Sequence, residues 1–374
     1  MDMKKIREEL LSQIDKHGIM MFSDTDKLNR ASTASNTYIF SNKNNQYILD
    51  PAFGAKRRRE ISKVLSKDDR FDVLCTHYHN DHSANNGQIA GKHSHIYYHY
   101  GIKKKIRYFR TNSTGQIVTM AKYLDLHGML KRFKMFPNWL ISLIVFSSKI
   151  SRVFPFAFLF FVSYIYSWQS IGQINSGRKK AKYFELANIE KISLGGIEID
   201  GWHIDDNLIA IDTQGHTDDH LIYYLTDKKI LFAGDTLNFL NGNDIQFGEI
   251  DKVDETIHIL LEFIEKEKVT ILLQGHYYPV TGTDNIMAYV SDIRDKHNEM
   301  YEITSSVIRS MEGPITFDKA LHKLYEHPAE LSQSLKKITF PRSTLVFLDV
   351  YLLKVLQSLG YEKQKNGKWV NNTI

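Results

Sequence analysis

The heptapeptide Thr76-His77-Tyr78-His79-Asn80-Asp81-His82 is the most informative stretch of this 374-residue chain. It places three imidazoles and one carboxylate within six positions, directly after the apolar run 71–75. Imidazole and carboxylate groups suit zinc, iron or manganese. In an extended loop the first two histidines project to one side, whereas the last two residues turn toward a second point. The stretch therefore predicts a metal site and leaves room for two metals.

The length and composition of the chain limit the kind of protein that it can be. A length of 374 residues is enough for one large domain, or for one domain with a smaller one, and for an ample core. Cys75 is the only cysteine, so no intrachain disulfide can form and a reducing compartment is expected. Residues 1–10 show a charged helical pattern without the apolar core of a secretory signal. These features predict a cytoplasmic protein.

Charge is distributed unevenly along the chain. Between residues 101 and 182, fifteen Lys or Arg stand against one acid, Asp125, which gives this segment a charge of +14. Because the whole chain carries +5, the remainder sums to −9. An acidic body therefore carries one strongly basic block, which also contains the apolar runs 136–146 and 153–168. The second run falls short of the roughly 20 apolar residues of a membrane span.

The order of the expected elements indicates an α/β fold. An amphipathic helix over 1–18 precedes two short strands, 36–41 and 46–50, a helix over 56–65 and a strand over 71–75. Strand-like segments resume after the basic block and continue to about residue 273. Polar clusters that follow strands lie where such sheets usually place their chemistry.

The C-terminal part of the sequence has a different pattern of expected elements. From residue 284 the pattern is mostly helical, with a long helix from about 343 to 359 that Gly360 stops. The final stretch, 361–370, predicts a hairpin that turns at Asn366-Gly367. Helices followed by a small hairpin predict a helical, winged-helix-like appendage over residues 286–374.

Three further polar residues follow apolar strands. They are His216, Asp235 and His276, and each comes directly after a glycine. A small residue at a strand end lets the backbone turn tightly and present the next side chain to a shared centre. Together with the opening heptapeptide, these positions supply seven candidate ligands.

The ordered motifs His77-x-His79-x-Asp81-His82, Gly215-His216-Thr217, Gly234-Asp235-Thr236 and Gly275-His276 resemble the metallo-β-lactamase superfamily. The resemblance covers roughly residues 30–100 and 190–285, and implies an αββα sandwich. The core would comprise 1–100 and 183–285, with 101–182 as a helical insertion.

The resemblance also implies roles for the ligands and the number of metals. One metal would be held by His77, His79 and His216. The other would be held by Asp81, His82 and His276, with Asp235 bridging both. Two divalent ions are therefore expected, with zinc first and iron or manganese as alternatives. Asp81 would also manage a proton, and Tyr277 would donate a hydrogen bond to an oxyanion.

The branch within the family is indicated less directly. Asp235-Thr-Leu-Asn-Phe resembles the thioesterase branch that includes glyoxalase II, although that branch's glutathione-binding positions are not identified. Asn238 stands where many acyl-homoserine lactonases of the family place a tyrosine. The expected function is hydrolysis of an ester or thioester of a lipophilic substrate by a metal-bound hydroxide. The alternatives are an iron-dependent thiol or persulfide oxidoreductase and a phosphodiesterase acting on phospholipid or nucleic acid.

The basic insertion has three interpretations. It could form an apolar lid over the metal cleft, contact an anionic membrane surface, or provide a homodimer interface or extra core. The first two are compatible and predict a lipophilic small-molecule substrate and a peripheral membrane location. Nucleic acid is a weaker expectation, because the basic residues alternate with long apolar runs and no second nuclease signature is present.

Overall fold

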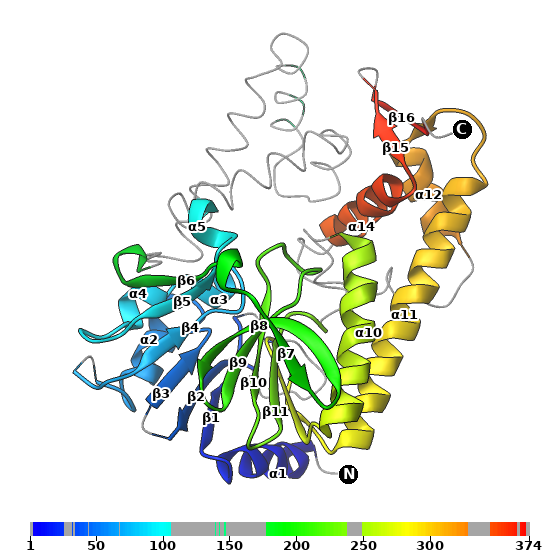
Figure 1. Ribbon diagram of the computed structural model, residues 1–374. Coiled ribbons are helices and arrows are strands. Elements are labelled where there is room, and N and C mark those ends of the chain that lie inside the picture. Colours follow the sequence, from blue (N-terminus) through cyan, green and yellow to red (C-terminus); the bar gives the residue numbers. More distant parts are fainter. Residues whose placement is uncertain are drawn as a thin grey trace.

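Two β-sheets form the body of the protein (Figure 1). The structure, a computed structural model, describes residues 3–25, 34–43, 45–66, 68–105, 177–237, 249–327, 345–364 and 367–371, together with residues 32, 139, 142 and 146. Most of the insertion that was predicted over 101–182, including nearly all of its two apolar runs, lies outside the described residues.

The first sheet has strands in the order β1-β2-β3-β4-β5-β6. They are β1 (Ile19–Phe22), β2 (Thr37–Asn42), β3 (Asn45–Leu49), β4 (Asp72–Leu74), β5 (Ile96–His99) and β6 (Ala181–Phe184). The strands from β3 to β6 pair in parallel, so their carboxyl ends meet at one edge. β6 begins two residues before the boundary predicted for the insertion, and together with β1 it was not expected from the sequence.

The second sheet has strands in the order β13-β12-β11-β10-β9-β8-β7. They are β7 (Glu190–Leu194), β8 (Ile197–Asp205), β9 (Leu208–Asp212), β10 (Leu221–Leu225), β11 (Ile230–Gly234), β12 (Ile271–Gln274) and β13 (Val280–Thr281). The β11–β12 pair is parallel, whereas the other neighbours are antiparallel. The loops after β9, β11 and β12 carry the three ligand candidates beyond the heptapeptide.

The core between the sheets follows from the two-residue period of the strands. Tyr38 and Phe40 of β2 and Tyr223 of β10 pack in this inner cluster, and Phe40 stacks on Phe232 with ring centroids 4.8 Å apart. Ile39, between the two inward aromatics of β2, belongs instead to the outer cluster of the first sheet. The alternation places one aromatic layer between two sheets and leaves apolar outer faces for helices.

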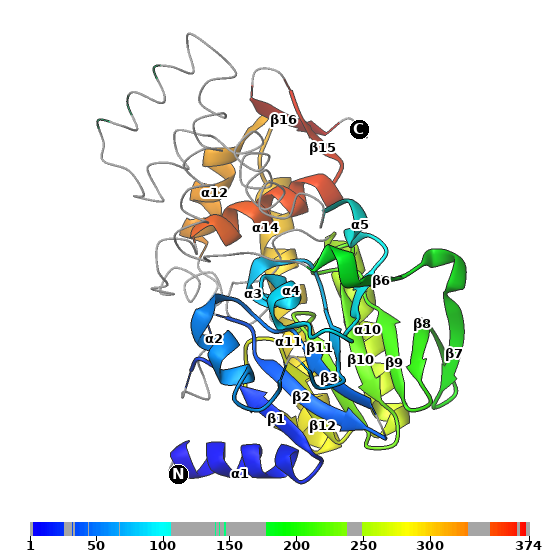
Figure 2. The ribbon, with the colours of Figure 1, turned by 90° about the vertical axis from the view of Figure 1, so that its left-hand side faces the viewer.

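Helices cover both outer faces, which confirms the αββα sandwich (Figures 1 and 2). On the side of the first sheet lie α2 (Gly54–Ile61), α3 (Asn80–Ser83), α4 (Asn86–Ile89) and α5 (Ile102–Lys105). On the side of the second sheet lie α10 (Ile250–Glu267) and α11 (Thr283–Arg309), while α1 (Met3–Asp15) packs at the end near β1. Among the described residues, no helix is both long and apolar enough to cross a membrane.

The C-terminal part has its own hydrophobic cluster. It contains α12 (Phe317–Glu326), α14 (Leu345–Ser358) and a small sheet of β14 (Ile315–Thr316), β15 (Tyr361–Lys363) and β16 (Lys368–Asn371). The predicted terminal hairpin is confirmed, since β15 and β16 pair antiparallel. The likeness to a winged helix stays a prediction. Ile250, at the start of α10, packs in the same cluster and ties this part to the second sheet.

Candidate metal centre

Four loops bring the predicted ligands to one end of the sandwich. The loop after β4 runs into α3 and carries the heptapeptide, while the loops after β9, β11 and β12 carry His216, Asp235 and His276. The ends of β4 and β10 are joined because Leu221 N donates to Thr76 O at 2.8 Å. The backbones approach so closely at Gly275 that a side chain there would overlap Asp235 Oδ1. Glycine at this position is therefore a steric requirement.

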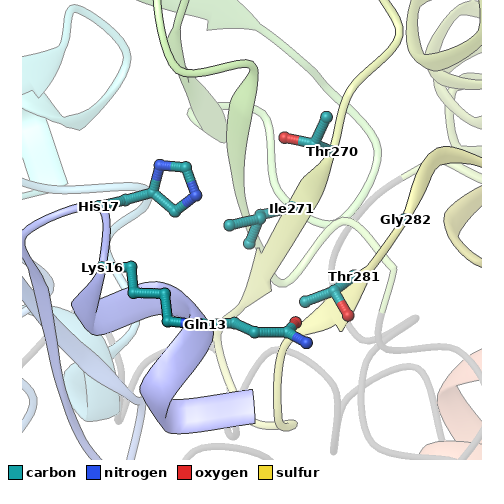
Figure 3. Close-up of a pocket in the computed structure, with 7 residues that line it drawn as sticks. All are labelled: Gln13, Lys16, His17, Thr270, Ile271, Thr281 and Gly282. Atoms are coloured by element: carbon teal, nitrogen blue, oxygen red, sulfur yellow. The ribbon is translucent and has the colours of Figure 1, made fainter. Parts of the chain in front are cut away.

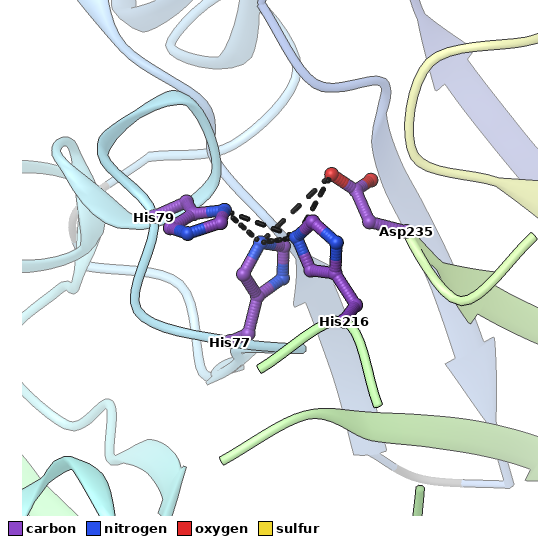
Figure 4. Close-up of side chains that lie close together, drawn as sticks. All are labelled: His77, His79, His216 and Asp235. Carbon is purple, nitrogen blue, oxygen red and sulfur yellow. Dashed lines mark hydrogen bonds and ion pairs between the residues drawn. The ribbon is translucent and has the colours of Figure 1, made fainter. Parts of the chain in front are cut away.

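His77, His79 and His216 form the first ligand group, with Asp235 beside them (Figure 4). His77 Nε2 lies 2.9 Å from His79 Nδ1, and His216 Nε2 lies 3.2 Å and 3.1 Å from these two atoms. One ligand atom from each of the four residues lies within 4.8 Å of every other. The three imidazoles thus converge on one point, as the sequence predicted.

Asp81, His82 and His276 form the second ligand group. His276 Nε2 lies 3.3 Å from both Asp81 Oδ2 and His82 Nε2. His82 Nε2 lies 4.0 Å from Asp81 Oδ2. The residues come from α3 and from the loop after β12, so the group joins the two sheets.

Asp235 lies between the two groups. Its Oδ2 is 3.9 Å from His77 Nε2 and 3.6 Å from His216 Nε2 on one side. On the other side it is 3.2 Å from His82 Nε2 and 3.4 Å from His276 Nε2. One carboxylate oxygen is thus within reach of imidazoles from both groups, which is the geometry expected of a bridging ligand.

The donor set fits divalent metal ions. Nitrogen ligands about 2.0–2.1 Å from a tetrahedral zinc are separated by roughly 3.3 Å, close to the spacing of the first group. In both imidazoles of the second group, the other ring nitrogen has a hydrogen-bond partner. His82 Nδ1 lies 2.8 Å from Asp50 Oδ2, and His276 Nδ1 lies 2.9 Å from Ser32 O. Such outer partners are typical of metal-binding histidines, because they turn Nε2 toward the ion. The seven residues thus form two groups, each of which could hold a metal ion.

Two imidazoles of the first group, those of His77 and His79, are neutral at pH 7. Burial, together with the neighbouring imidazoles, holds the pKa of His77 well below its usual value. Burial and the nearby His216 lower the pKa of His79 to about 3. Neutral imidazole is the form that binds a metal, so these histidines need not lose a proton first.

The second group is charged. Burial alone would lower the pKa of His82, but the carboxylates of Asp235 and Asp50 outweigh it and raise that pKa to about 10. Burial is likewise outweighed at His276, where Asp235 and Asp81 raise the pKa well above its usual value. In turn, His276 and His82 lower the pKa of the half-buried Asp81 carboxyl, although partial desolvation acts in the opposite direction. Imidazolium and carboxylate therefore compensate each other where the second metal would bind.

Asp50 supports the heptapeptide, a role that was not predicted from the sequence. Its Oδ1 accepts from Thr76 N at 2.9 Å, and its Oδ2 accepts from Thr76 Oγ1 at 2.7 Å in addition to contacting His82. The side chain is buried, with 2% exposed. The signal that could have found it is an acid at the end of β3, whose parallel neighbour β4 leads into the heptapeptide.

His220 holds the bridging loop and is fully buried. Asp235 N donates to His220 Nε2 at 3.1 Å, and His220 Nδ1 lies within 3.1 Å of Thr213 Oγ1 and Thr236 Oγ1. A side chain at Gly234 would come within 2.8 Å of the same ring. The role of His220 is therefore to fix the backbone of Asp235.

The two tyrosines after His276 have different surroundings. Tyr278 Oη donates to Thr25 O at 2.9 Å and accepts from Arg7 Nε at 2.6 Å, so it fastens α1 to this loop. Tyr277 is 9% exposed, and its proposed hydrogen bond to substrate stays a prediction.

A separate hollow of about 410 Å³ lies between α1 and the strands β12 and β13 (Figure 3). Its lining contains no predicted ligand and consists of Gln13, Lys16, His17, Thr270, Ile271, Thr281 and Gly282. Ile271 and Thr270 lie at the start of β12, whereas His276 follows its end. The hollow is therefore at the opposite end of the strand from the metal centre.

Comparison with known proteins supports the fold. Residues 32–123 match the family model described as the metallo-beta-lactamase superfamily. This match contains the heptapeptide and Asp50. A search of curated proteins returned no match to the sequence.

Solved structures match over most of the chain. A metallo-beta-lactamase family protein from Thermus thermophilus is 14% identical, with a TM-score of 0.51 over 94% of this chain and 97% of its own. A beta-lactamase domain protein from Burkholderia ambifaria is 12% identical, with a TM-score of 0.52 over 95% and 92%. At these identities the likeness shows a metallo-β-lactamase fold and leaves the branch and the substrate open.

Proposed function

We propose that this protein is a metal-dependent hydrolase that uses a two-metal centre to cleave an ester or thioester with a lipophilic acyl part. The observation that carries the proposal is the position of Asp235 Oδ2, within 3.9 Å of imidazole nitrogens from both ligand groups. Two ions held on either side of one carboxylate suit a reaction in which both an attacking and a leaving oxygen or sulfur need stabilisation.

The proposed ligands have different roles. His77, His79 and His216 would hold one ion, and Asp81, His82 and His276 the other, with Asp235 shared. When bound, divalent ions supply Lewis acidity and lower the pKa of a coordinated water toward neutrality. The side chains keep the centre anchored to both sheets, so that the substrate meets a fixed arrangement.

Asp81 is the proposed proton carrier. Its side chain is 34% exposed, whereas those of the imidazoles it faces are at most 9% exposed, so it is the most accessible member of the second group. Its lowered pKa keeps it a carboxylate at neutral pH, in the form that accepts a proton. A carboxylate at this place can accept a proton from the attacking water and later pass one to the leaving group. Tyr277 is proposed as a donor to the substrate oxyanion.

Metal analysis combined with a hydrolysis panel tests the proposal. The panel compares thioesters, esters, lactones, phosphodiesters and phospholipids, and thioester or ester turnover is expected to exceed the rest. The variant His77→Ala should lower that turnover by more than about 100-fold, because it removes a proposed ligand. His258→Ala serves as the matched control, since that side chain is 59% exposed on α10. Iron alone with oxygen consumption would support thiol oxidation instead.

We further propose that the insertion contacts an anionic lipid surface. Trp139 and Phe146 are helical residues that are 68% and 61% exposed, and a spacing of seven positions is that of one face of an amphipathic helix. The surrounding sequence is rich in Lys and Arg, each of which contributes about 1 kcal/mol near an anionic bilayer. An aromatic face among basic residues is typical of a helix that lies in a membrane surface.

Sedimentation with vesicles tests this contact. The full chain should sediment with phosphatidylserine-containing vesicles and much less with neutral phosphatidylcholine vesicles. Changing Trp139 and Phe146 together to Ala should reduce binding at least about 10-fold. The same change at Met20, which is 42% exposed on β1, should leave binding unchanged. Equal sedimentation of the double variant and the unaltered chain would remove the proposal.

A further inference from the structure

A short stretch before β2, here called the clamp and defined as Ser32, Ser35 and Asn36, lies against both loops that carry the second ligand group. Ser35 N donates to Asp81 O at 3.1 Å. Ser32 N donates to His276 O at 2.9 Å, and Asn36 N donates to Gly275 O at 2.5 Å. One stretch of backbone therefore joins two ligands that are far apart in the sequence.

The side chain of Asn36 completes this contact. Its Nδ2 donates to Gln274 O at 3.1 Å and to Tyr277 O at 2.7 Å, so both of its N–H groups are used. The two accepting carbonyls flank His276 in the chain. Asn36 is 1% exposed, and buried hydrogen bonds of this kind are costly to leave unmade. The amide thus holds the loop on either side of the ligand.

The clamp also sets the direction of the His276 ring. Its Nδ1 lies 2.9 Å from Ser32 O, and a ring nitrogen that faces a carbonyl carries the proton. The opposite nitrogen, Nε2, is consequently free of the proton in the neutral ring and points to Asp81 Oδ2 and Asp235 Oδ2, 3.3 Å and 3.4 Å away. Both the backbone and the ring of this ligand are therefore fixed by the clamp.

The first ligand group depends on other parts of the chain. His77 Nδ1 lies 3.0 Å from Thr76 Oγ1, its neighbour in the heptapeptide. The loop of His216 rests on the first turns of α10, where Thr256 Oγ1 donates to Gln214 O at 2.6 Å. A side chain at Gly215 would come within 3.1 Å of Val253 in the same part of the helix. Thr76 Oγ1 also lies 3.4 Å from His82 Nδ1, so the histidines of the heptapeptide share a support. The contacts of the Asn36 side chain, in contrast, lie on the His276 loop alone.

We propose that Asn36 is a positioning residue that sets the affinity of the second metal site without setting that of the first. The inference rests on the two-metal centre proposed above and goes beyond it, because it predicts unequal sites under separate control. Removal of an outer hydrogen-bond partner of a metal ligand typically costs about 10-fold to 100-fold in metal affinity. Here the loss should fall on one half-site only.

Calorimetric titration of the metal-free full chain with Zn²⁺ tests the inference. The unaltered chain should bind two equivalents. Asn36→Ala should weaken the second equivalent about 10-fold to 100-fold and leave the first within twofold. Asn36→Asp should weaken the second at least as much, because its oxygen would face two carbonyls. Asn42→Ala is the matched control, since Asn42 is 2% exposed at the other end of β2 and bonds Asp205 instead.

Three outcomes would overturn the assignment. They are a single equivalent bound by the unaltered chain, equal weakening of both equivalents in Asn36→Ala, and an equal effect of Asn42→Ala on the second equivalent. The experiment measures metal binding and not turnover. An unaltered chain that binds two ions but hydrolyses nothing would therefore contradict the proposed function and not the role of Asn36.

Hydrogen exchange on the unaltered chain covers the case in which the variants do not fold. Peptides spanning 32–36 and 274–278 should become protected when the second equivalent of Zn²⁺ is added, because the clamp and the loop close on the ion together. Protection that is complete after the first equivalent, or absent after both, would contradict the inference. This measurement needs no substitution and no turnover.

Discussion

Asp235 lies between the two ligand groups, and its surroundings are tightly packed. His82 and His276 hold the pKa of this carboxyl well below its usual range despite complete burial. His220 fixes its backbone through the 3.1 Å bond to Asp235 N. Gly275 packs against its other oxygen. The bridging position is therefore built by residues from three separate loops.

Gly275→Ala tests how tightly this residue is enclosed. The added methyl group would overlap Asp235 Oδ1 and lie 3.0 Å from Gly234 O, so Asp235 has to move. We expect loss of at least one bound metal and a destabilisation of about 1–3 kcal/mol, as for other overpacked sites. Gly196→Ala is the control for metal content, because a side chain there meets nothing within 4 Å; its φ of +87° by itself strains alanine, so this variant does not serve as a control for stability. Metal content and urea unfolding measure the two effects, and retention of both metals in Gly275→Ala would refute this packing.

Asp50 is the second residue whose loss should be severe. Its carboxylate accepts from Thr76 N and Oγ1 and contacts His82, so Asp50→Ala leaves buried donors without an acceptor. We expect a loss of about 3–5 kcal/mol in the free energy of unfolding of the metal-free protein, as for other broken buried pairs. Asp206→Ala, which removes an exposed partner of Lys43, should leave the urea midpoint unchanged. Similar midpoints for the two variants would contradict the role given to Asp50.

At the scale of elements, helix α11 carries a buried titratable group away from the metal centre. His297 is 1% exposed, and burial lowers its pKa, although Asp254 acts in the opposite direction. Below about pH 6.5 the unfolded chain therefore binds a proton at this residue that the folded chain does not. The free energy of unfolding is therefore unaffected by this group above about pH 6.5, and it decreases as the pH falls below that value.

His297→Leu should consequently flatten the acid side of the stability profile. Between pH 6.5 and pH 5.5 the unaltered protein should lose up to about 1.4 kcal/mol more than the variant, which is the limit for one proton. Urea unfolding at pH 7.5, 6.5 and 5.5 measures the difference. His322→Leu, at an exposed position of α12, should keep the profile of the unaltered chain. Parallel profiles for all three proteins would show that His297 is not the titrating group.

The elements also show what sequence could and could not predict. The heptapeptide and the glycine-preceded residues were found because each signal is local: a strand, a tight turn and a ligand within a few positions. The roles of Asn36 and Asp50 were not predicted because their hydrogen-bond partners are distant in the sequence. The partners of Asn36 Nδ2 are 238 and 241 residues away, and the partner of Asp50 Oδ1 is 26 residues away. β1 and β6 were missed because short edge strands carry little pattern of their own.

At the scale of the whole molecule, the centre joins the two sheets, so metal binding and stability are linked. Ligands of each half-site come from loops of both sheets, His77 with His216 and His82 with His276. An ion that binds only the folded chain stabilises it by about 2.7 kcal/mol when its free concentration is 100 times the dissociation constant. A chelator should therefore lower the melting temperature by several degrees, and zinc should restore it. An unchanged melting temperature would contradict a centre shared between the sheets.

The measurement that tests the central claim most directly is native mass spectrometry of the full chain after reconstitution with zinc. The predicted result is one dominant species whose mass equals that of the chain plus two zinc ions, reduced to one zinc in His276→Ala. Control spectra of His258→Ala should match the unaltered chain. Spectra in which no species exceeds the mass of the chain plus one ion would contradict a two-metal centre bridged by Asp235.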